Sequence, residues 1–245
     1  METVTKTPTP FVILFQGRSG STYLAEALDS HPDIDCDGER LVPLRKQGSQ
    51  AQLDWTAEFL GGSEAKDASA VGFKTKIDDM LDREAMADVM HRANAKVIHL
   101  QRRNLVKVVV SWFNCERVFA ATGDWNIYPP QEALGPFAID PEKFQRRLGL
   151  AIQGRARLND YVAGLGLRTH SVVYEDLLVD GAKVLVDCCD FLGVEAVALY
   201  GRCRKATVDN LRQVIKNFNA LYDIYCGTEF DSMFHEVLVN AELPR

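Results

Sequence analysis

The residues most able to do chemistry lie in a short loop near the start of the chain, residues 17–22, which read Gly-Arg-Ser-Gly-Ser-Thr. Glycine and small hydroxyl residues let successive backbone N–H groups curl around an anion at the positive end of a following helix. Phosphate is the natural occupant of such a site. Taken alone, the loop is equally compatible with an ordinary Gly/Ser turn, so other segments must decide between the two interpretations.

The order of residues in this loop differs from the nucleoside-triphosphate loop of kinases. That loop places a lysine directly after its last glycine, followed by a Ser or Thr that holds magnesium. Here the cation, Arg18, precedes Gly20, and the chain contains no Gly-Lys pair. A metal-dependent kinase is therefore disfavoured.

A second basic segment follows an apolar run in the middle of the chain. Residues 96–104 read Lys-Val-Ile-His-Leu-Gln-Arg-Arg-Asn, which predicts a strand running into a basic turn, and the helix expected next carries Ser111. In open parallel sheets, ligands bind at the carboxyl ends of the strands. We therefore expect Arg18 and Arg103 to face the same crevice.

The elements that must position these residues are predicted from the alternation of apolar runs with helical patterns. Buried strands are expected at residues 11–15, 70–73, 95–100 and 170–174. Helical spacing predicts helices from residue 22 to just before Pro32 and at residues 84–93, 105–119, 141–163, 179–192 and 208–222, the last packing on the sheet. This order predicts an α/β fold, a P-loop-like parallel sheet with helices on both faces.

Residues 1–245 are expected to form a single domain, with residues 1–10 as a loose N-terminal arm. Residues 61–69 and 122–141 carry turn residues and are expected to be surface loops, the second long enough to act as a lid or substrate loop.

Composition narrows the class of protein. The 28 basic and 34 acidic residues give a net charge of -6, which argues against a protein that coats nucleic acid. The 6 cysteines lack metal-ligand spacing and are expected to be reduced, mostly buried thiols. The start of the chain has no apolar signal core, and no apolar run is long enough to span a membrane, so a cytoplasmic location is predicted. Nothing in the sequence indicates an oligomeric state.

Three segments together resemble the sulfotransferase family. They are the loop at residues 18–22, Arg103 with Ser111 eight residues later, and the Tyr-Glu-Asp-Leu run at residues 174–177. They occur in the family's order, and a Phe-Leu-Gly at residues 191–193 extends the resemblance over most of the chain. The arginine in the loop, a His-Pro at residues 31–32 and a Gly-Glu at residues 38–39 look closest to bacterial and Golgi-type carbohydrate sulfotransferases.

This resemblance implies a donor, 3′-phosphoadenylyl sulfate (PAPS), released as adenosine 3′,5′-bisphosphate (PAP), and no metal. It assigns the 5′-phosphosulfate of the donor to the loop residues Arg18, Ser19, Gly20, Ser21 and Thr22. It assigns the 3′-phosphate to Arg103 and Ser111, since a guanidinium fork with a nearby hydroxyl suits a terminal phosphate. Tyr23 occupies the place of an aromatic residue that flanks adenine in relatives, and Tyr174 is a second candidate. Core packing is the alternative for both tyrosines.

The resemblance also implies the chemistry of the acceptor side. Sulfuryl transfer resembles phosphoryl transfer, so the protein mainly positions groups and neutralises charge, with Arg18 stabilising the leaving phosphate oxygen. Glu39, in the family's Gly-Glu position, is the candidate base, although a surface or capping glutamate is the alternative. Lys74 ends a strand and is expected to contact the transferring sulfonate or the acceptor. Lys74, Lys76 and Asp78 are the alternatives to Glu39 for the catalytic role, and the sequence does not rank them.

The chain departs from the cytosolic branch of the family at two points. That branch uses a histidine base, and no histidine here sits in a matching motif. It also closes over the 3′-phosphate with a glycine-rich basic loop, whereas this chain has only the basic residues 202–205, of which Arg204 and Lys205 are candidates for a similar purpose.

The function predicted from the sequence is transfer of a sulfuryl group to a hydroxyl of a carbohydrate or small-molecule acceptor. A P-loop nucleotide kinase and a non-catalytic PAP-binding module are the alternatives. Trp112, Trp125 and Tyr128 either stack on a sugar or another ring or anchor the core and loops, and the sequence does not choose between these roles.

Overall fold

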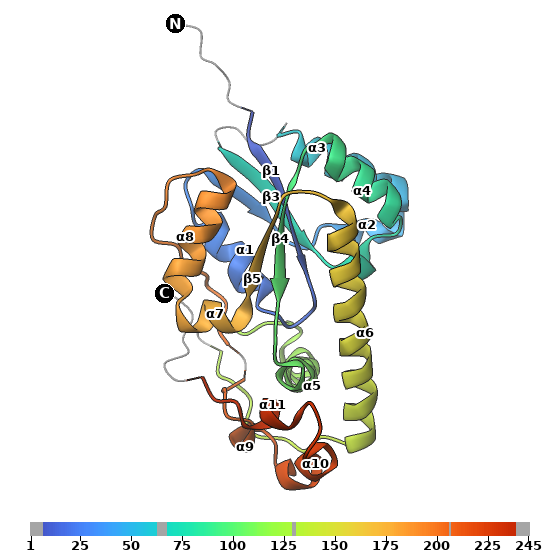
Figure 1. Ribbon diagram of the computed structural model, residues 1–245, viewed down its shortest axis with the longest axis vertical. Helices are drawn as coiled ribbons and strands as arrows, with labels where there is room; N and C mark the ends of the chain where they lie inside the picture. Colours follow the sequence, from blue (N-terminus) through green and yellow to red (C-terminus); the bar gives the residue numbers. More distant parts are fainter. Residues whose placement is uncertain (1–6, 63–67, 129–130, 206, 239–245) are drawn as a thin grey trace, which may run out of the picture.

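The structure is a computed structural model that describes residues 7–62, 68–128, 131–205 and 207–238. At its centre lies a five-stranded parallel sheet with the strand order β2-β3-β1-β4-β5 (Figure 1). The strands are β1 (Thr9–Phe15), β2 (Ile34–Asp37), β3 (Ala70–Thr75), β4 (Lys96–Gln101) and β5 (Thr169–Val173). This sheet and its flanking helices confirm the predicted fold class.

Helices cover both faces of the sheet and extend beyond the carboxyl ends of its strands (Figure 1). They are α1 (Ser21–Asp29), α2 (Leu41–Leu44), α3 (Ser49–Leu60), α4 (Arg83–Arg92), α5 (Leu105–Thr122), α6 (Pro141–Leu165), α7 (Tyr174–Val179), α8 (Gly181–Leu192), α9 (Leu211–Val214), α10 (Phe218–Tyr225) and α11 (Asp231–His235). Short 3-10 turns lie at Arg45–Gln47 and Ile77–Asp79.

The first strand is the centre of the core, because both of its faces are covered. Phe11 and Ile13 belong to a cluster with residues of α1 and α8, whereas Val12 and Leu14 belong to a second cluster with residues of α3, α4 and α6. Side chains alternate between the two faces of a strand, so a continuous apolar run fits a strand that is buried on both sides. β1 thereby holds the loop that follows it at a fixed point of the sheet.

The helix predicted at residues 208–222 is wrong. The chain there forms two short helices, α9 and α10, separated where Ile215 is extended (φ -102°, ψ 111°) and forms a β-bridge with Phe137. Both helices pack with α5 and α6 in a third apolar cluster rather than on the sheet. The backbone pairing of Ile215 interrupts a sequence whose apolar spacing alone is helical.

Other differences concern the ends of elements. β1 begins at Thr9, so the predicted N-terminal arm is shorter than expected, and its residues 1–6 lie outside the described residues. The helix predicted at residues 179–192 begins at Gly181, after the separate helix α7. The predicted loop at residues 61–69 is described only in part, because residues 63–67 lie outside the described residues. All six cysteines are free and four are buried, as expected.

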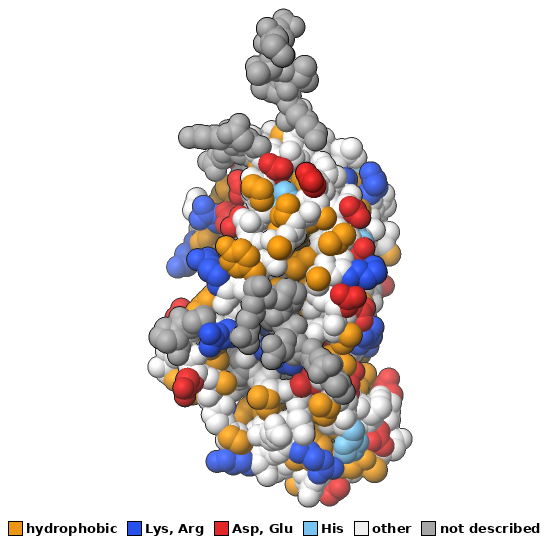
Figure 2. Space-filling view, turned by 90° about the vertical axis from the view of Figure 1, so that its left-hand side faces the viewer, with side chains coloured by type: hydrophobic (Ala, Val, Ile, Leu, Met, Phe, Trp, Pro, Cys, Tyr) orange, Lys and Arg blue, Asp and Glu red, His pale blue; other side chains and the backbone are white. Residues whose placement is uncertain are grey.

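The surface of the described residues carries both signs of charge. Figure 2 shows acidic and basic side chains interspersed on one face of the molecule. No helix in the described part of the chain is long and apolar enough to cross a membrane.

Candidate active site

The loop between β1 and α1 has a backbone shape suited to an anion. Arg18 (φ 69°) and Gly20 (φ 85°) both adopt left-handed conformations, and the Ser19 hydroxyl donates to the Gln16 carbonyl over 2.6 Å. Left-handed residues in a tight turn aim neighbouring N–H groups into one concavity. A non-glycine residue in this conformation costs free energy, so the surrounding contacts must hold Arg18 in place.

The amino end of α1 continues this site. Gly20 caps the helix, and no side chain of the cap accepts a hydrogen bond there. The first N–H groups of a helix have no acceptor within the helix and carry the positive end of its dipole. The loop and the helix start together therefore present N–H groups and positive potential to an incoming anion.

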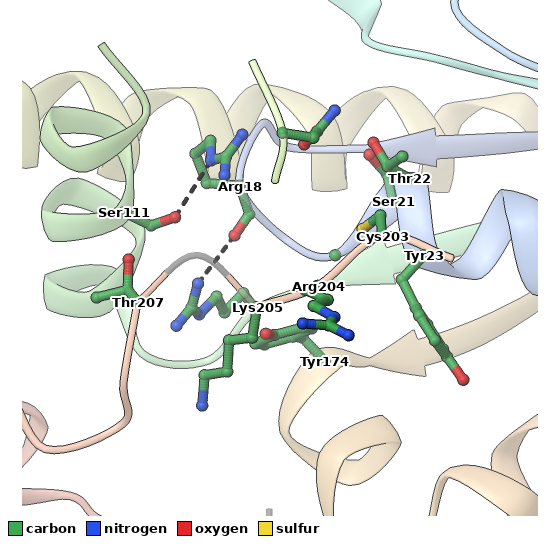
Figure 3. Close-up of a pocket in the computed structure, with 13 residues that line it drawn as sticks. Arg18, Ser21, Thr22, Tyr23, Ser111, Tyr174, Cys203, Arg204, Lys205 and Thr207 are labelled. Carbon is green, nitrogen blue, oxygen red and sulfur yellow. Dashed lines mark hydrogen bonds between the residues drawn. The ribbon is translucent and has the colours of Figure 1, made fainter. Parts of the chain in front are cut away.

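A pocket opens beside this loop (Figure 3). Its lining residues come from the loop and α1, from the end of β4 and α5, from α7, and from two loops further along the chain. They are Arg18, Gly20, Ser21, Thr22, Tyr23, Arg102, Ser111, Asn126, Tyr174, Cys203, Arg204, Lys205 and Thr207.

Arg18 joins the loop to helix α5. Its Nε donates to Ser111 Oγ over 3.2 Å, and its Nη1 donates to the carbonyl of Trp125 over 3.4 Å. Arg102 Nη1 donates to the Arg18 carbonyl over 3.0 Å (Figure 3). Arg18 and Ser111, which the resemblance assigns to different phosphates, therefore lie in direct contact in the structure.

The structure does not bring the Arg103 side chain to the pocket beside Arg18. The Arg103 side chain is 58% exposed and pairs with Asp176 over 2.8 Å. Arg102, which is 8% exposed, lines the pocket instead. Successive side chains of an extended segment point in opposite directions, so only one of two adjacent arginines can point inward.

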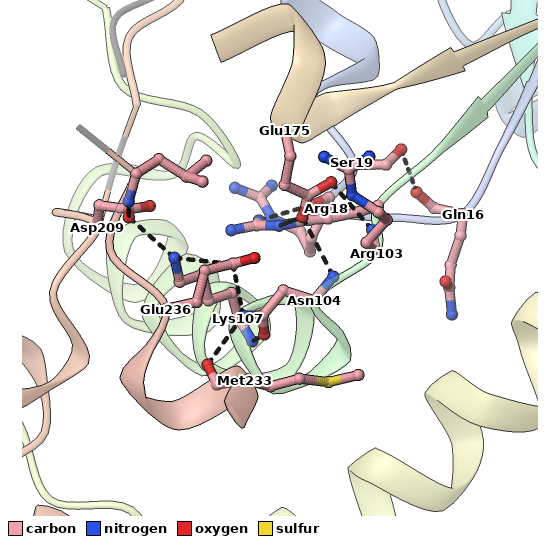
Figure 4. Close-up of polar contacts among 12 residues, drawn as sticks. Gln16, Arg18, Ser19, Arg103, Asn104, Lys107, Glu175, Asp209, Met233 and Glu236 are labelled. Atoms are coloured by element: carbon pink, nitrogen blue, oxygen red, sulfur yellow. Dashed lines mark hydrogen bonds and ion pairs between the residues drawn. The ribbon is translucent and has the colours of Figure 1, made fainter. Parts of the chain in front are cut away.

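Glu175 holds the turn so that Arg102, and not Arg103, points inward. Its carboxylate is buried and accepts hydrogen bonds from the backbone N–H of Arg103 (3.0 Å) and of Asn104 (3.1 Å) (Figure 4). Its Oε1 also lies 3.9 Å from Arg102 Nε. The turn after β4 is thus held in one orientation by the glutamate of the Tyr-Glu-Asp run, a role that sequence reasoning did not assign.

The two tyrosines proposed to flank adenine are packed against backbone. A Cβ atom at Gly20 would lie 2.4 Å from Cδ2 of Tyr174, and the Arg102 guanidinium carbon lies 4.6 Å from the Tyr174 ring centroid. A Cβ atom at Gly201 would lie 2.6 Å from Cδ2 of Tyr23, whose burial raises its pKa to about 12. Both rings line the pocket, but these contacts favour the packing interpretation for each.

A basic segment completes the pocket. Arg204 and Lys205, the candidate substitutes for a glycine-rich loop, both line it. Asp209 accepts from Lys205 Nζ over 3.0 Å and from the Leu238 N–H over 2.7 Å. It also accepts from the buried Lys107 Nζ over 2.9 Å (Figure 4). Burial lowers the pKa of Lys205, although Asp209 opposes that effect. Asp209 therefore anchors the basic segment to α5.

A second charged cluster lies at the carboxyl end of β3. Lys74 Nζ donates to Thr22 Oγ1 over 2.8 Å and lies 3.4 Å from Glu39 Oε1. Lys76 Nζ pairs with the other oxygen of Glu39 and with Asp79 Oδ2 at 3.1 Å. Because Thr22 lines the pocket, Lys74 connects Glu39 to it.

The pKa values in this cluster are set by burial and by mutual charge. Burial alone would raise the pKa of Glu39, but the ammonium groups of Lys74 and Lys76 outweigh it and lower that pKa. Burial lowers the pKa of Lys74 despite Glu39, while Glu39 and Asp79 together raise the pKa of Lys76 against the effect of burial. Glu39 is therefore an ionised carboxylate at neutral pH.

Asp78 lies apart from this cluster. Its carboxylate is mostly exposed and pairs with Arg83 (2.9 Å) and Arg157 (3.4 Å). Of the residues that the sequence left in competition, Lys74 and Lys76 both contact Glu39, and Asp78 is not joined to them. Asp79, which sequence reasoning did not consider, takes part instead.

Similarity to known proteins extends over most of the chain. No protein-family model matches the chain. Nodulation protein H of Rhizobium tropici is 24% identical over 249 residues, which cover 97% of this chain and 97% of that protein. Nodulation protein H of Rhizobium meliloti strain 1021 is 27% identical over 232 residues, covering 87% of this chain and 90% of that protein.

Among solved structures, a sulfotransferase from Alicyclobacillus acidocaldarius superposes with a TM-score of 0.50 at 17% identity, covering 94% of this chain and 97% of that chain. The chain has the sulfotransferase fold. The family resemblance read from three short motifs is thus confirmed at the level of the fold.

Within the sulfotransferase fold, some site residues gave no usable signal in the sequence. Asn126, Cys203 and Thr207 line the pocket from loops without regular secondary structure. Asp209 and Glu175 act through contacts more than 70 residues away in sequence. The position of Glu175 in the Tyr-Glu-Asp-Leu run was recognised, but its contacts with the turn after β4 were not.

Proposed function

We propose that this protein is a sulfotransferase that moves a sulfuryl group from PAPS to a hydroxyl of a carbohydrate or small-molecule acceptor. The observation that carries the proposal is the connection between an anion-binding loop and a carboxylate, through Lys74, which contacts both Thr22 and Glu39. The sulfotransferase fold and the similarity to Nodulation protein H support it.

The chemistry of the pocket suits a donor with two anionic ends. Arg18, Arg102, Arg204 and Lys205 all line it, together with the open amino end of α1. Arg102 lines the pocket, and a guanidinium presents several donors that suit phosphate oxygens. We assign the 5′-phosphosulfate to the loop and the 3′-phosphate to Arg102 with Ser111.

The proposed reaction is an in-line displacement at sulfur. The acceptor oxygen attacks the sulfur atom, the bond from sulfur to the 5′-phosphate oxygen breaks, and PAP leaves. Arg18 neutralises charge on the leaving phosphate, and Lys74 neutralises the sulfonate oxygens. Glu39 accepts the proton of the acceptor hydroxyl. It is already ionised at neutral pH, and a weak base suffices because the proton is lost late when the transition state is loose.

The test uses radiolabelled PAPS with a panel of alcohols and saccharides. Glu39→Gln should lower the transfer rate by about 10²- to 10⁴-fold, the usual contribution of a general base, while PAP binding stays intact. The matched control is Asp78→Asn, which removes a nearby carboxylate that pairs with other residues. It should leave the rate unchanged.

Three results would contradict the proposal. Full activity of Glu39→Gln together with loss of activity in Asp78→Asn would mean that Asp78, and not Glu39, is the base. PAP binding without transfer to any acceptor would indicate a non-catalytic module. Phosphate transfer from ATP with magnesium would indicate a kinase.

A further inference from the structure

An exposed aromatic surface lies next to the pocket. We call the side chains of Trp112, Phe119 and Trp125 the aromatic ledge. The rings of Phe119 and Trp125 stack with centroids 4.3 Å apart and planes 16° apart, and Trp112 lies 6.5 Å from Trp125 at 27°. Trp125 is 48% exposed and Phe119 is 41% exposed.

The aromatic ledge is not needed for the core of the fold. Helix α5 buries a different set of side chains against α6 and α10, including Val106, Val109 and Val110. The ledge rings contact one another instead. Large aromatic side chains that are grouped and exposed are typical of ligand-binding surfaces, whereas single exposed apolar residues need no explanation.

The ledge is continuous with the proposed donor pocket. The carbonyl of Trp125 accepts a hydrogen bond from Arg18, and the next residue, Asn126, lines the pocket. At its other end, Trp112 follows Ser111, which also lines the pocket and contacts Arg18. A molecule lying on the ledge would therefore lie beside Arg18 of the phosphate loop.

Polar groups border the ledge on one side. Glu116 Oε1 accepts from Trp112 Nε1 over 3.1 Å and from Arg147 Nη2 over 2.9 Å. The Arg147 guanidinium carbon lies 4.6 Å from the Trp112 ring centroid. Both charged side chains are partly exposed, so they offer one acceptor and several donors beside the rings.

We propose that the aromatic ledge is the acceptor subsite for a neutral carbohydrate. This inference rests on the proposed sulfotransferase function and narrows its acceptor class. A pyranose ring presents an apolar C–H face to Trp125 and Phe119 and a hydroxyl edge to Glu116 and Arg147. An acyl chain or an aryl ring would cover the ledge but would leave the remaining hydrogen-bonding capacity of Glu116 and Arg147, beyond their mutual ion pair, unsatisfied, which costs affinity.

The test compares acceptors and variants. Maltotetraose and cellotetraose represent neutral carbohydrates, and naphthol and octanol represent apolar alcohols. Trp125→Ala should raise the KM for the tetrasaccharides about tenfold or more, with kcat and PAP affinity little changed, because the lost contact is made equally in the ground state and the transition state. Trp125→Phe should largely restore the KM.

Two further variants separate this role from a general effect on the structure. Glu116→Gln should raise the KM for the tetrasaccharides and leave that for naphthol unchanged, since only the saccharides use the polar border. Ile224→Ala removes an exposed apolar side chain on α10, away from the pocket, and should change neither value.

The inference and the proposed function fail in different ways. Binding of the tetrasaccharides is measured independently of turnover, by titrating them into the protein with PAP and following tryptophan fluorescence. A response that disappears in Trp125→Phe supports the ledge even if no transfer occurs. The ledge is overturned as the acceptor subsite if the tryptophan fluorescence of the unaltered protein does not change when the tetrasaccharides are added. It is also overturned if Trp125→Ala transfers the sulfuryl group with an unchanged tetrasaccharide KM.

Discussion

Replacing Arg102 or Arg103 tests which of these adjacent arginines binds the 3′-phosphate of the donor. The family resemblance assigns the 3′-phosphate to Arg103, whereas the structure directs Arg102 into the pocket and leaves Arg103 paired with Asp176 at the surface. We predict that Arg102→Ala weakens PAP binding strongly and that Arg103→Ala does not.

The size of the effect follows from the contacts. Arg102 is largely buried and lines the pocket, so a phosphate bound there would form a charge-assisted hydrogen bond with its guanidinium. Such bonds contribute about 1.5–3 kcal/mol, and each ~1.4 kcal/mol is tenfold in affinity, so the Kd should rise roughly 10- to 100-fold. Arg103 makes an exposed ion pair, whose loss costs about 0–1 kcal/mol of stability.

The assay is calorimetric titration of each variant with PAP at fixed ionic strength. Arg102 Nη1 also holds the Arg18 carbonyl, so its removal could distort the loop as well. Adenosine 5′-monophosphate, which lacks the 3′-phosphate, controls for this. If Arg102 binds the 3′-phosphate, Arg102→Ala should lower the affinity for PAP and leave that for the monophosphate almost unchanged.

Three results would refute this reasoning. Equal losses for PAP and the monophosphate would mean that Arg102 acts through the shape of the loop. A larger loss of PAP affinity in Arg103→Ala than in Arg102→Ala would mean that Arg103, the residue that the motif indicates, binds the 3′-phosphate. Unchanged PAP binding in both variants would remove this segment from the donor site.

Further predictions concern the groups around the site. Lys76→Met removes a positive charge that lowers the pKa of Glu39, so that pKa should rise and the acidic limb of the pH–rate profile should move to higher pH; a fixed limb would mean that another group titrates. Gly20→Ala places a Cβ atom 2.4 Å from Tyr174 at a positive φ and should destabilise the fold by about 2–4 kcal/mol, measured by urea unfolding, whereas an unchanged midpoint would show that the loop can shift. Asp209→Asn should weaken PAP binding by loosening the basic segment, and calorimetry that finds wild-type affinity would exclude that role.

The parts of the fold that the sequence predicted are those with strong local signals. β1 is a continuous apolar run, and such a run has few alternatives to a strand buried on both faces. The strand β2 was missed because its four residues, Ile-Asp-Cys-Asp, are short and half polar. The last predicted helix failed because a backbone pairing at Ile215 overrides its local periodicity.

The same distinction holds for the candidate site. Lys74 could be placed at the end of a predicted strand, but its approach to Glu39 depends on β2, the short strand before Glu39 that the sequence did not reveal. The choice between Arg102 and Arg103 could not be predicted from their positions, since it depends on Glu175, which lies 72 residues beyond Arg103 in the chain. Contacts of that range leave no periodic trace in the sequence.

The charges of the site show how a chain with a net charge of -6 can build an anion-binding pocket. Most cations near the pocket are already paired with carboxylates: Lys74 with Glu39, and Lys205 with Asp209. Arg18 is different, because the acceptors it contacts among the described residues are the neutral oxygens of Ser111 and Trp125. An incoming phosphosulfate would displace two neutral contacts of Arg18 rather than a carboxylate. Arg18 can therefore form an ion pair with the donor without first breaking another ion pair, whereas the paired lysines hold the geometry around it.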